Sequence, residues 1–163
     1  MEGVPTELTK AQELVYELKI QEVMKRQVIT VGPECTMSDL KELLRTQRIS
    51  GVPVLQDGSL VGMISIENLF RAFDQGDLTK ATVGDKMTRN VVTVRANETV
   101  VSAVNLFARL GYGRFPVVDD DGHLVGILSK GDIVRGLLRR MEVQWQAEEI
   151  RRYRASHIFE DIE

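Results

Sequence analysis

The residues with the clearest chemical potential are Ser129, Lys130 and Asp132, in the segment Ser-Lys-Gly-Asp that precedes an apolar run. An ionised carboxylate accepts hydrogen bonds from neighbouring hydroxyl groups, and such charge-assisted bonds are about twice as strong as neutral ones. Ser129 lies where a strand is expected to become a helix, so its hydroxyl and the N–H groups of the first helical turn can meet a phosphate. Lys130 adds a local cation. The segment can therefore hold both hydroxyl and phosphate groups.

The same segment also has a structural interpretation. Ser-x-x-Asp before an apolar run is the pattern of a helix capping box, in which each side chain satisfies a backbone N–H group of the first turn. Capping and ligand binding do not exclude each other. The residues alone leave both roles open.

A related segment, Ser65-Ile66-Glu67-Asn68, has the same outline with different charges. Asn68 is neutral and offers one acceptor oxygen, whereas Glu67 repels phosphate. We therefore expect unequal sites, with the segment around Asp132 binding better and the segment around Asn68 weak, empty or selective for a less phosphorylated ligand.

The two segments occupy equivalent positions in an internal repeat. Aligning Met24 with Met87 gives a shift of 63 residues that becomes 64 after Asp121, with 16 identities over the 48 positions from Met24 to Arg71. Self-similarity at this level indicates two copies of one structural unit. The two candidate binding segments therefore lie at matching positions of a duplicated structural unit.

Each copy predicts a strand, a helix, two strands and a second helix. The expected strands cover 28–31, 52–55 and 60–64 in the first copy, and 91–94, 115–118 and 124–128 in the second. Thr36, Ser65, Thr99 and Ser129 are expected to open the helices. A unit of about 55 residues buries its sheet poorly alone. We therefore predict an α+β fold in which two pseudo-two-fold-related β-α-β-β-α repeats pack through their small sheets, with ligand clefts between them.

The predicted layout places an N-terminal helix at 1–19, the first repeat at 20–74, a linker at 75–81, the second repeat at 82–139 and a C-terminal helix or connector at 140–163. The apolar yet coreless ending 158–163 suggests a fragment of a longer chain, or a tail that pairs with another subunit.

The repeated motifs resemble those of the CBS domain, the family named after cystathionine β-synthase. They are Gly-Val-Pro-Val (51–54) and Arg-Phe-Pro-Val-Val-Asp (114–119), followed by Leu-Val-Gly-Met-Ile-Ser (60–65) and Leu-Val-Gly-Ile-Leu-Ser (124–129). Two such domains in tandem look like a Bateman module. The resemblance covers about residues 20–139 and implies an αβ pair that senses adenosine-containing ligands.

The resemblance also implies roles for individual residues. Asp132 would clamp the ribose of the ligand, with Asn68 at the matching position of the first repeat. The residues that would border the adenine are Val92, Thr93 and Pro116 in the second repeat, and Ile29, Thr30 and Pro53 in the first. Equally, the threonines can be ordinary strand residues and the prolines can mark strand starts.

Upstream of the second site, Arg114 could reach a phosphate and Tyr112 could stack on a purine. Their counterparts in the first repeat, Gly51 and Ile49, offer neither a charge nor an aromatic ring. The first repeat therefore has the weaker set of candidate ligand-binding residues, which includes Ser65, Asn68 and Gly51. Alternatively, Tyr112 is a partly buried core aromatic and Arg114 a solvated strand residue.

Composition excludes several other classes. The formal charge of −3 gives no global field for nucleic acid, and no segment approaches the roughly 18 apolar residues of a membrane span. A single cysteine, Cys35, favours a reducing compartment such as the cytoplasm and lacks a visible activating base. Asp119-Asp120-Asp121-Gly122 fails the calcium-loop pattern and favours a polar hairpin turn. We expect no metal site and no catalytic residue.

The sequence therefore favours a regulatory module that binds an adenine nucleotide or a related adenosyl compound and signals to an attached or partner effector. The alternative is a ligand-free dimerisation or scaffold module. A homodimer is expected, and no cofactor is required beyond the regulatory ligand. The sequence leaves open which ligand is used: AMP, ADP, ATP, S-adenosylmethionine, NAD and cyclic dinucleotides share the adenosine.

Overall fold

The computed structural model describes residues 6–160, with side chains described for residues 12–154. The chain divides into two compact units, and both combine segments far apart in the sequence. The first, called here the helical unit, contains the described residues up to Met24, together with Asn97–Arg114 and the chain from Leu128 onward. The second, the sheet unit, contains Lys25–Ala96 and Phe115–Ile127. The division cuts across the repeats found in the sequence.

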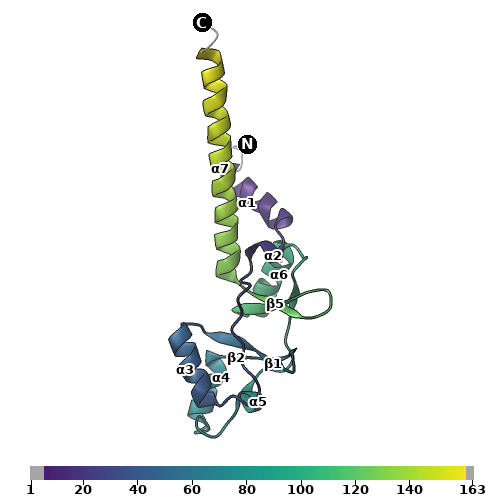
Figure 1. Cartoon of the computed structure of the whole chain (residues 1–163), viewed down its shortest axis with the longest axis vertical. Helices are drawn as coiled ribbons and strands as arrows, with labels where there is room; N and C mark the ends of the chain where they lie inside the picture. The colour runs from purple at the N-terminus through teal and green to yellow at the C-terminus, as the bar shows by residue number, and fades with distance from the viewer. Residues whose placement is uncertain (1–5, 161–163) are drawn as a thin grey trace. The chain divides into compact units, whose positions relative to one another are not determined.

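Four helices make up the helical unit: α1 (Thr6–Glu17), α2 (Ile20–Val23), α6 (Val100–Leu110) and α7 (Lys130–Glu160) (Figure 1). α1 packs on α6 and α7, and α2 packs on α7. The N-terminal helix expected from apolar spacing is therefore present. Its end is joined to the start of α6 by backbone hydrogen bonds from Val100 N to Leu18 O (2.8 Å) and from Ile20 N to Glu98 O (2.9 Å).

Two contacts fix α2 against α7. Gly136 lies so close to Val23 that a Cβ atom at position 136 would overlap the valine side chain. Glu22 accepts a hydrogen bond from Lys19 N (2.8 Å) and forms an ion pair with Arg140 (2.8 Å). The Lys19 N–H, followed by Arg140, lowers the pKa of the Glu22 carboxyl. The close approach thus depends on a glycine and on a charged pair.

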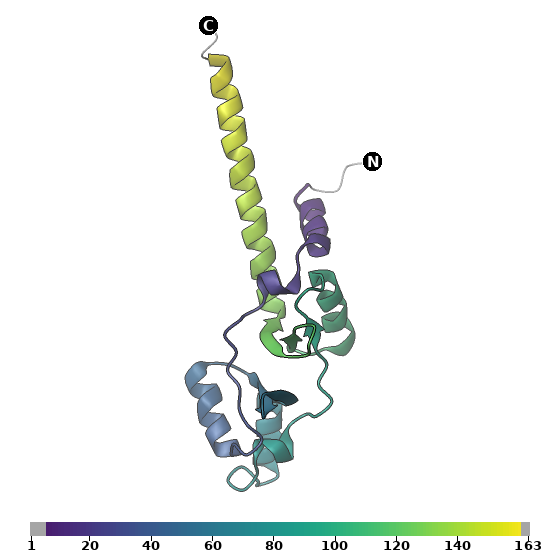
Figure 2. The ribbon, with the colours of Figure 1, turned by 45° about the vertical axis from the view of Figure 1, so that its right-hand side comes forward.

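α7 runs without interruption through the predicted boundary at 139/140, as Figure 2 shows. The closing helix of the second repeat and the C-terminal connector are therefore one helix. No helix within residues 6–160 combines the length and apolar character that crossing a membrane requires.

The sheet unit contains α3 (Met37–Gln47), β1 (Gly51–Gln56), β2 (Ser59–Ser65), α4 (Ile66–Asp74), α5 (Val83–Lys86) and β3 (Val94–Arg95). Most of β4 (Arg114–Val118) and β5 (Leu124–Ser129) also belongs to it. β1 and β2 form an antiparallel pair, and a second sheet has the order β3-β4-β5. The mixed fold with small sheets confirms the predicted fold class.

The core of the sheet unit forms where the apolar faces of α3 and α4 meet the β1–β2 pair. Its fully buried side chains include Met37, Leu40, Val52, Val54 and Ile64. Thr36 caps α3 by accepting a hydrogen bond from Asp39 N (3.1 Å), as its spacing predicts. The helix–strand–strand–helix part of the predicted repeat is therefore present in this half of the chain.

The prediction for the first strand of each repeat is wrong, because the structure has a much shorter pairing at both places. In place of 28–31 there is a single parallel bridge from Val31 to Val54, and in place of 91–94 the strand covers only Val94–Arg95. Val31 donates to Pro53 O (3.2 Å) and accepts from Leu55 N (2.9 Å). Continuing this ladder toward residue 29 needs an N–H at position 53, and proline has none. Pro116 stands one residue before Val117, the partner of Val94, so it ends the second ladder in the same way.

Candidate functional site

The second-repeat site is built at the junction of β5 and α7, where Ser129 is the last strand residue and Lys130 the first helical one. Ser129 N donates to Asp132 Oδ2 (2.9 Å), and Asp132 N donates to Ser129 Oγ (3.2 Å). These reciprocal bonds form the capping box that the spacing allows. Only 4% of Asp132 is exposed, so the strand–helix junction holds a buried carboxylate in a fixed position.

Arg135, which the sequence analysis did not single out, completes this junction. Its Nη2 atom lies 2.8 Å from Asp132 Oδ1 and forms an ion pair with it. An ideal Cβ atom on Gly131 would lie 3.0 Å from Arg135 Nη1, so the guanidinium covers this glycine. A spacing of three residues on a helix was the available signal for this pair.

Lys130 faces a neighbouring helix. Its Nζ atom lies 6.0 Å from the centroid of the Phe107 ring on α6. This distance is at the limit of a cation–π contact. The lysine therefore places a positive charge at the start of α7, near the buried Phe107 ring.

Tyr112 and Arg114 follow α6 in the same unit. Gly111 ends that helix with a φ of 69°, a left-handed conformation that glycine adopts without strain. Tyr112 is 46% exposed and Arg114 is half-buried as the first residue of β4. About half of the Tyr112 surface is therefore buried, and the rest is open to solvent.

The other second-repeat candidates belong to the sheet unit. Pro116 is buried within β4, Val92 is half-buried and Thr93 is exposed. Val92 and Thr93 precede β3, and Pro116 removes the N–H that would have paired them with β4. Val92 and Thr93 therefore lie outside the sheet, immediately before β3.

The first-repeat site lies wholly in the sheet unit, at the junction of β2 and α4. Asn68 Oδ1 accepts from Ser65 N (2.9 Å) and from Ser65 Oγ (2.8 Å). Asn68 Nδ2 donates to Lys86 O on α5 (2.9 Å). An aspartate could not make this last bond when ionised, because a carboxylate has no donor. Asn68 therefore joins two helices, a role that the sequence analysis missed.

Lys86 extends this connection into the loop after α4. Its Nζ atom donates to Gln75 Oε1 (2.8 Å) and to Asp77 Oδ2 (2.9 Å). Its backbone carbonyl holds Asn68 while its side chain holds the loop. Lys86, which lies within the predicted second repeat, thus contacts both the predicted linker at 75–81 and Asn68 of the first repeat.

Four further first-repeat candidates lie around β1. Gly51 pairs with Ser65, and a Cβ atom at this glycine would lie 3.0 Å from Ile64 O, so the two strands approach closely there. Pro53 is buried and accepts the Val31 bond, Thr30 is half-buried and Ile29 is exposed. β1 thus holds Gly51 and Pro53 through its backbone contacts with β2 and Val31.

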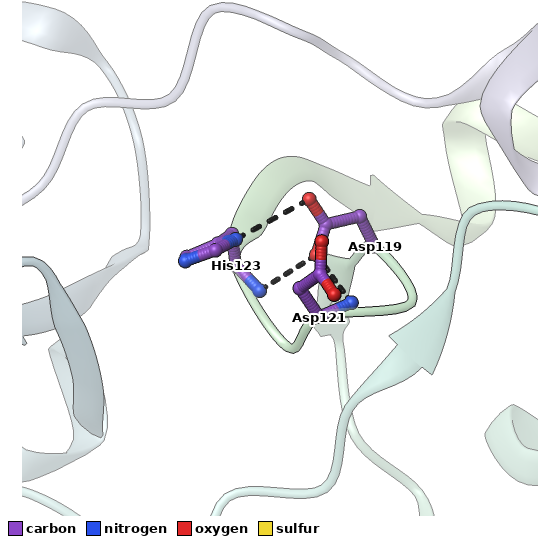
Figure 3. A group of neighbouring side chains, drawn as sticks. All are labelled: Asp119, Asp121 and His123. Atoms are coloured by element: carbon purple, nitrogen blue, oxygen red, sulfur yellow. Dashed lines mark hydrogen bonds and ion pairs between the residues drawn. The ribbon is translucent and has the colours of Figure 1, made fainter.

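A third cluster of polar side chains closes the turn between β4 and β5 (Figure 3). Asp119 Oδ1 accepts from Asp121 N (3.0 Å) and from His123 N (2.8 Å), and Asp119 Oδ2 lies 3.6 Å from His123 Nδ1. The His123 N–H makes the largest contribution to lowering the pKa of the Asp119 carboxyl. These bonds account for the gathering of Asp119, Asp121 and His123 as closure of a polar turn.

Cys35 precedes the cap of α3. Partial burial, with Asp39 and Glu34 nearby, raises the pKa of its thiol. Because the thiolate is the nucleophilic form, this environment opposes reactivity.

Comparison with known sequences gives matches over both repeats. The family model described as the CBS domain matches residues 20–75 and 83–139. The uncharacterized protein MJ1232 of Methanocaldococcus jannaschii is 31% identical over 121 residues, which are 74% of this chain and 40% of that protein. An inosine-5'-monophosphate dehydrogenase of Thermoplasma acidophilum is 32% identical over 77% of this chain and 25% of the enzyme. The chain therefore spans less than half the length of these two relatives.

Solved structures give the same picture. CBSX2 in complex with AMP, a protein from Arabidopsis thaliana, is 31% identical with a TM-score of 0.68, covering 76% of this chain and 98% of that one. The CBS domain pair of protein MJ0100, in complex with 5'-methylthioadenosine and S-adenosyl-L-methionine, is 27% identical with a TM-score of 0.65, covering 72% and 93%. Both are pairs of the same domain.

Proposed function

The chain belongs to the CBS domain family, with one copy at residues 20–75 and a second at 83–139, and from this premise we propose that it is a regulatory module that binds an adenosine-containing ligand. The observation that carries the proposal is the buried carboxylate of Asp132, held at the first turn of α7 by Ser129. Family members of similar sequence have been solved with AMP and with S-adenosyl-L-methionine, which supports this ligand class.

In the proposed second-repeat site, Asp132 accepts hydrogen bonds from the ribose hydroxyls. Ser129, Lys130 and Arg114 bind phosphate, because the first turn of a helix and nearby cations favour an anion. Tyr112 is exposed enough to stack on the base. The family resemblance assigns the adenine itself to Val92, Thr93 and Pro116.

The proposed first-repeat site uses Ser65, Asn68, Gly51, Pro53, Ile29 and Thr30 and binds more weakly. Asn68 is neutral and already bonded to Ser65 and Lys86. A ligand hydroxyl would compete with these bonds. We therefore expect measurable occupancy of the second site first.

The proposed mechanism is linkage without a chemical step. A ligand that binds one arrangement of the two repeats more tightly than another shifts the population toward that arrangement, and an effector responds to the shift. That effector is an attached C-terminal domain or a separate partner, and the chain itself catalyses no reaction. The family relationship supports two repeats at 20–74 and 82–139, with the segments outside them available for signalling.

We also propose that the module is a homodimer. Phe70 and Phe73 lie one turn apart on α4 and expose 62% and 67% of their surface. Burying two aromatic side chains against a second copy removes a large apolar area from water. Light scattering at micromolar concentration that gives a monomer mass would contradict this part of the proposal.

The proposed ligand class is tested by calorimetric titration with AMP, ADP, ATP, S-adenosylmethionine and NAD. The variant is Asp132→Asn, which keeps an acceptor for Ser129 N–H but removes the charge. We expect saturable binding of at least one compound, weakened at least tenfold in the variant. Folded, nucleotide-free protein that binds none of them would refute ligand sensing.

A second function, a scaffold that binds no ligand, is favoured by one observation. The capping boxes give both Asp132 and Asn68 a complete structural role. Failure of the whole titration panel together with a stable dimer would establish this alternative.

A further inference from the structure

We propose that Arg135 is a specificity-determining latch over the Asp132 carboxylate, which favours phosphorylated adenosine ligands over unphosphorylated ones. The inference rests on the proposed function and adds the discrimination to it. Its starting point is an asymmetry in burial: Asp132 is 4% exposed, whereas the side chain of Arg135 is 58% exposed. The carboxylate is thus covered by a group that faces solvent and can move.

The position of the guanidinium determines what a ligand meets first. Arg135 Nη2 donates a hydrogen bond to Asp132 Oδ1 (2.8 Å), while Nη1 lies over Gly131 in the first turn of α7. The other carboxylate oxygen accepts from Ser129 N. Ribose hydroxyls that approach Asp132 from the side of Oδ1 therefore compete with the guanidinium for the same oxygen.

The charge of the displaced guanidinium gives the discrimination. Displacement by an uncharged nucleoside separates Arg135 from the Asp132 carboxylate and offers the guanidinium no anion in exchange. A ligand with a phosphate offers the guanidinium a new anion at the helix start, where Lys130 also lies, and guanidinium binds phosphate through paired hydrogen bonds. The net cost of opening the latch is therefore lower for a nucleotide than for a nucleoside.

The first repeat supplies an internal control. Arg71 occupies the position equivalent to Arg135, but the residue equivalent to Asp132 is Asn68. Asn68 is neutral, and its amide is bonded to Ser65 and Lys86. An ion pair of the Asp132–Arg135 kind therefore cannot form in the first repeat, although both arginines are exposed and lie on the second turn of their helices.

The experiment measures the dissociation constants of adenosine and AMP for the wild type, Arg135→Gln and Arg71→Gln. We expect the ratio of the adenosine constant to the AMP constant to fall about tenfold in Arg135→Gln, because adenosine binds more tightly and AMP more weakly. The ratio in Arg71→Gln stays within twofold of the wild type. Circular dichroism melting of all three proteins verifies that each is folded.

Three results would overturn the inference, and they are distinguishable. If the wild type binds AMP or adenosine but Arg135→Gln leaves the ratio unchanged, Arg135 is a structural ion pair only and the proposed function stands. If the folded wild type binds neither compound at millimolar concentration, the proposed function fails and the latch fails with it. A fall of the same size in Arg71→Gln would also refute the latch, since the effect would then be one of general surface charge.

Discussion

Replacing Asn68 by aspartate tests whether the first repeat has lost a ligand-binding carboxylate or gained a structural amide. The substitution restores the residue type found at the equivalent position 132. It also removes the hydrogen bond from Asn68 Nδ2 to Lys86 O and places a carboxylate oxygen against that carbonyl. Asn68 is only 7% exposed, so water compensates little.

The expected loss of stability follows from these contacts. A net hydrogen bond is worth about 1 kcal/mol, and leaving a buried carbonyl unsatisfied costs about 1–3 kcal/mol. We therefore expect Asn68→Asp to lower the free energy of unfolding by about 2–3 kcal/mol. For a chain of this size that corresponds to a fall in melting temperature of roughly 5–10 °C.

The assay is thermal and urea unfolding followed by circular dichroism, with Asp132→Asn as the matched reverse exchange. An asparagine at 132 still accepts from Ser129 N–H and loses the ion pair with the partly exposed Arg135, so we expect the free energy of unfolding to fall by at most about 1 kcal/mol. A stability of Asn68→Asp within about 0.5 kcal/mol of the wild type, well below the cost of an unsatisfied carbonyl, would refute the reasoning.

Three further predictions address other parts of the chain. Gly136→Ala should lower the free energy of unfolding by about 1–3 kcal/mol, because the added methyl group pushes α2 away from α7. Gly131→Ala should lower it less, because the added methyl group meets the end of the flexible Arg135 side chain. Urea unfolding of both variants measures the two losses, and equal losses would contradict the close contact between Gly136 and Val23. Asp119 has a lowered pKa when folded, so its contribution to stability is present above the unfolded value of 3.8 and is lost as the pH falls below it. Asp119→Asn should therefore flatten the acid limb of a plot of unfolding free energy against pH; an unchanged slope would show that the turn is not coupled to this carboxyl. Cys35, whose thiol pKa is raised, should react with iodoacetamide at pH 7.5 more slowly than free cysteine, and a faster reaction would show an activated thiol.

The sequence by itself determined the elements whose signals are local. The duplication, with Ser129 and Ser65 at matching positions, predicted the order of helices and strands and the family. Thr36 and Ser129 were predicted to cap helices because a cap and its partner lie three residues apart, and a helix brings those positions together whatever the rest of the chain does. The Asp132–Arg135 pair has the same local basis and could have been found.

The shortened strands could also have been anticipated from sequence. Pro53 and Pro116 stand next to the residues that pair with Val31 and Val94. A proline at that register stops a parallel ladder because it lacks the donor. Strand propensity alone, which favoured 28–31 and 91–94, does not contain this information because it ignores the partner strand.

Only the tertiary structure decided the contacts between residues distant in the chain. Asn68 meets Lys86 across 18 positions, and Glu22 meets Arg140 across 118. No spacing rule relates such residues, since their separation in space depends on the path of every element between them. The sequence therefore located the candidate site at Asp132 and Asn68, while the fold decided that one carries an ion pair at its surface and the other a structural amide.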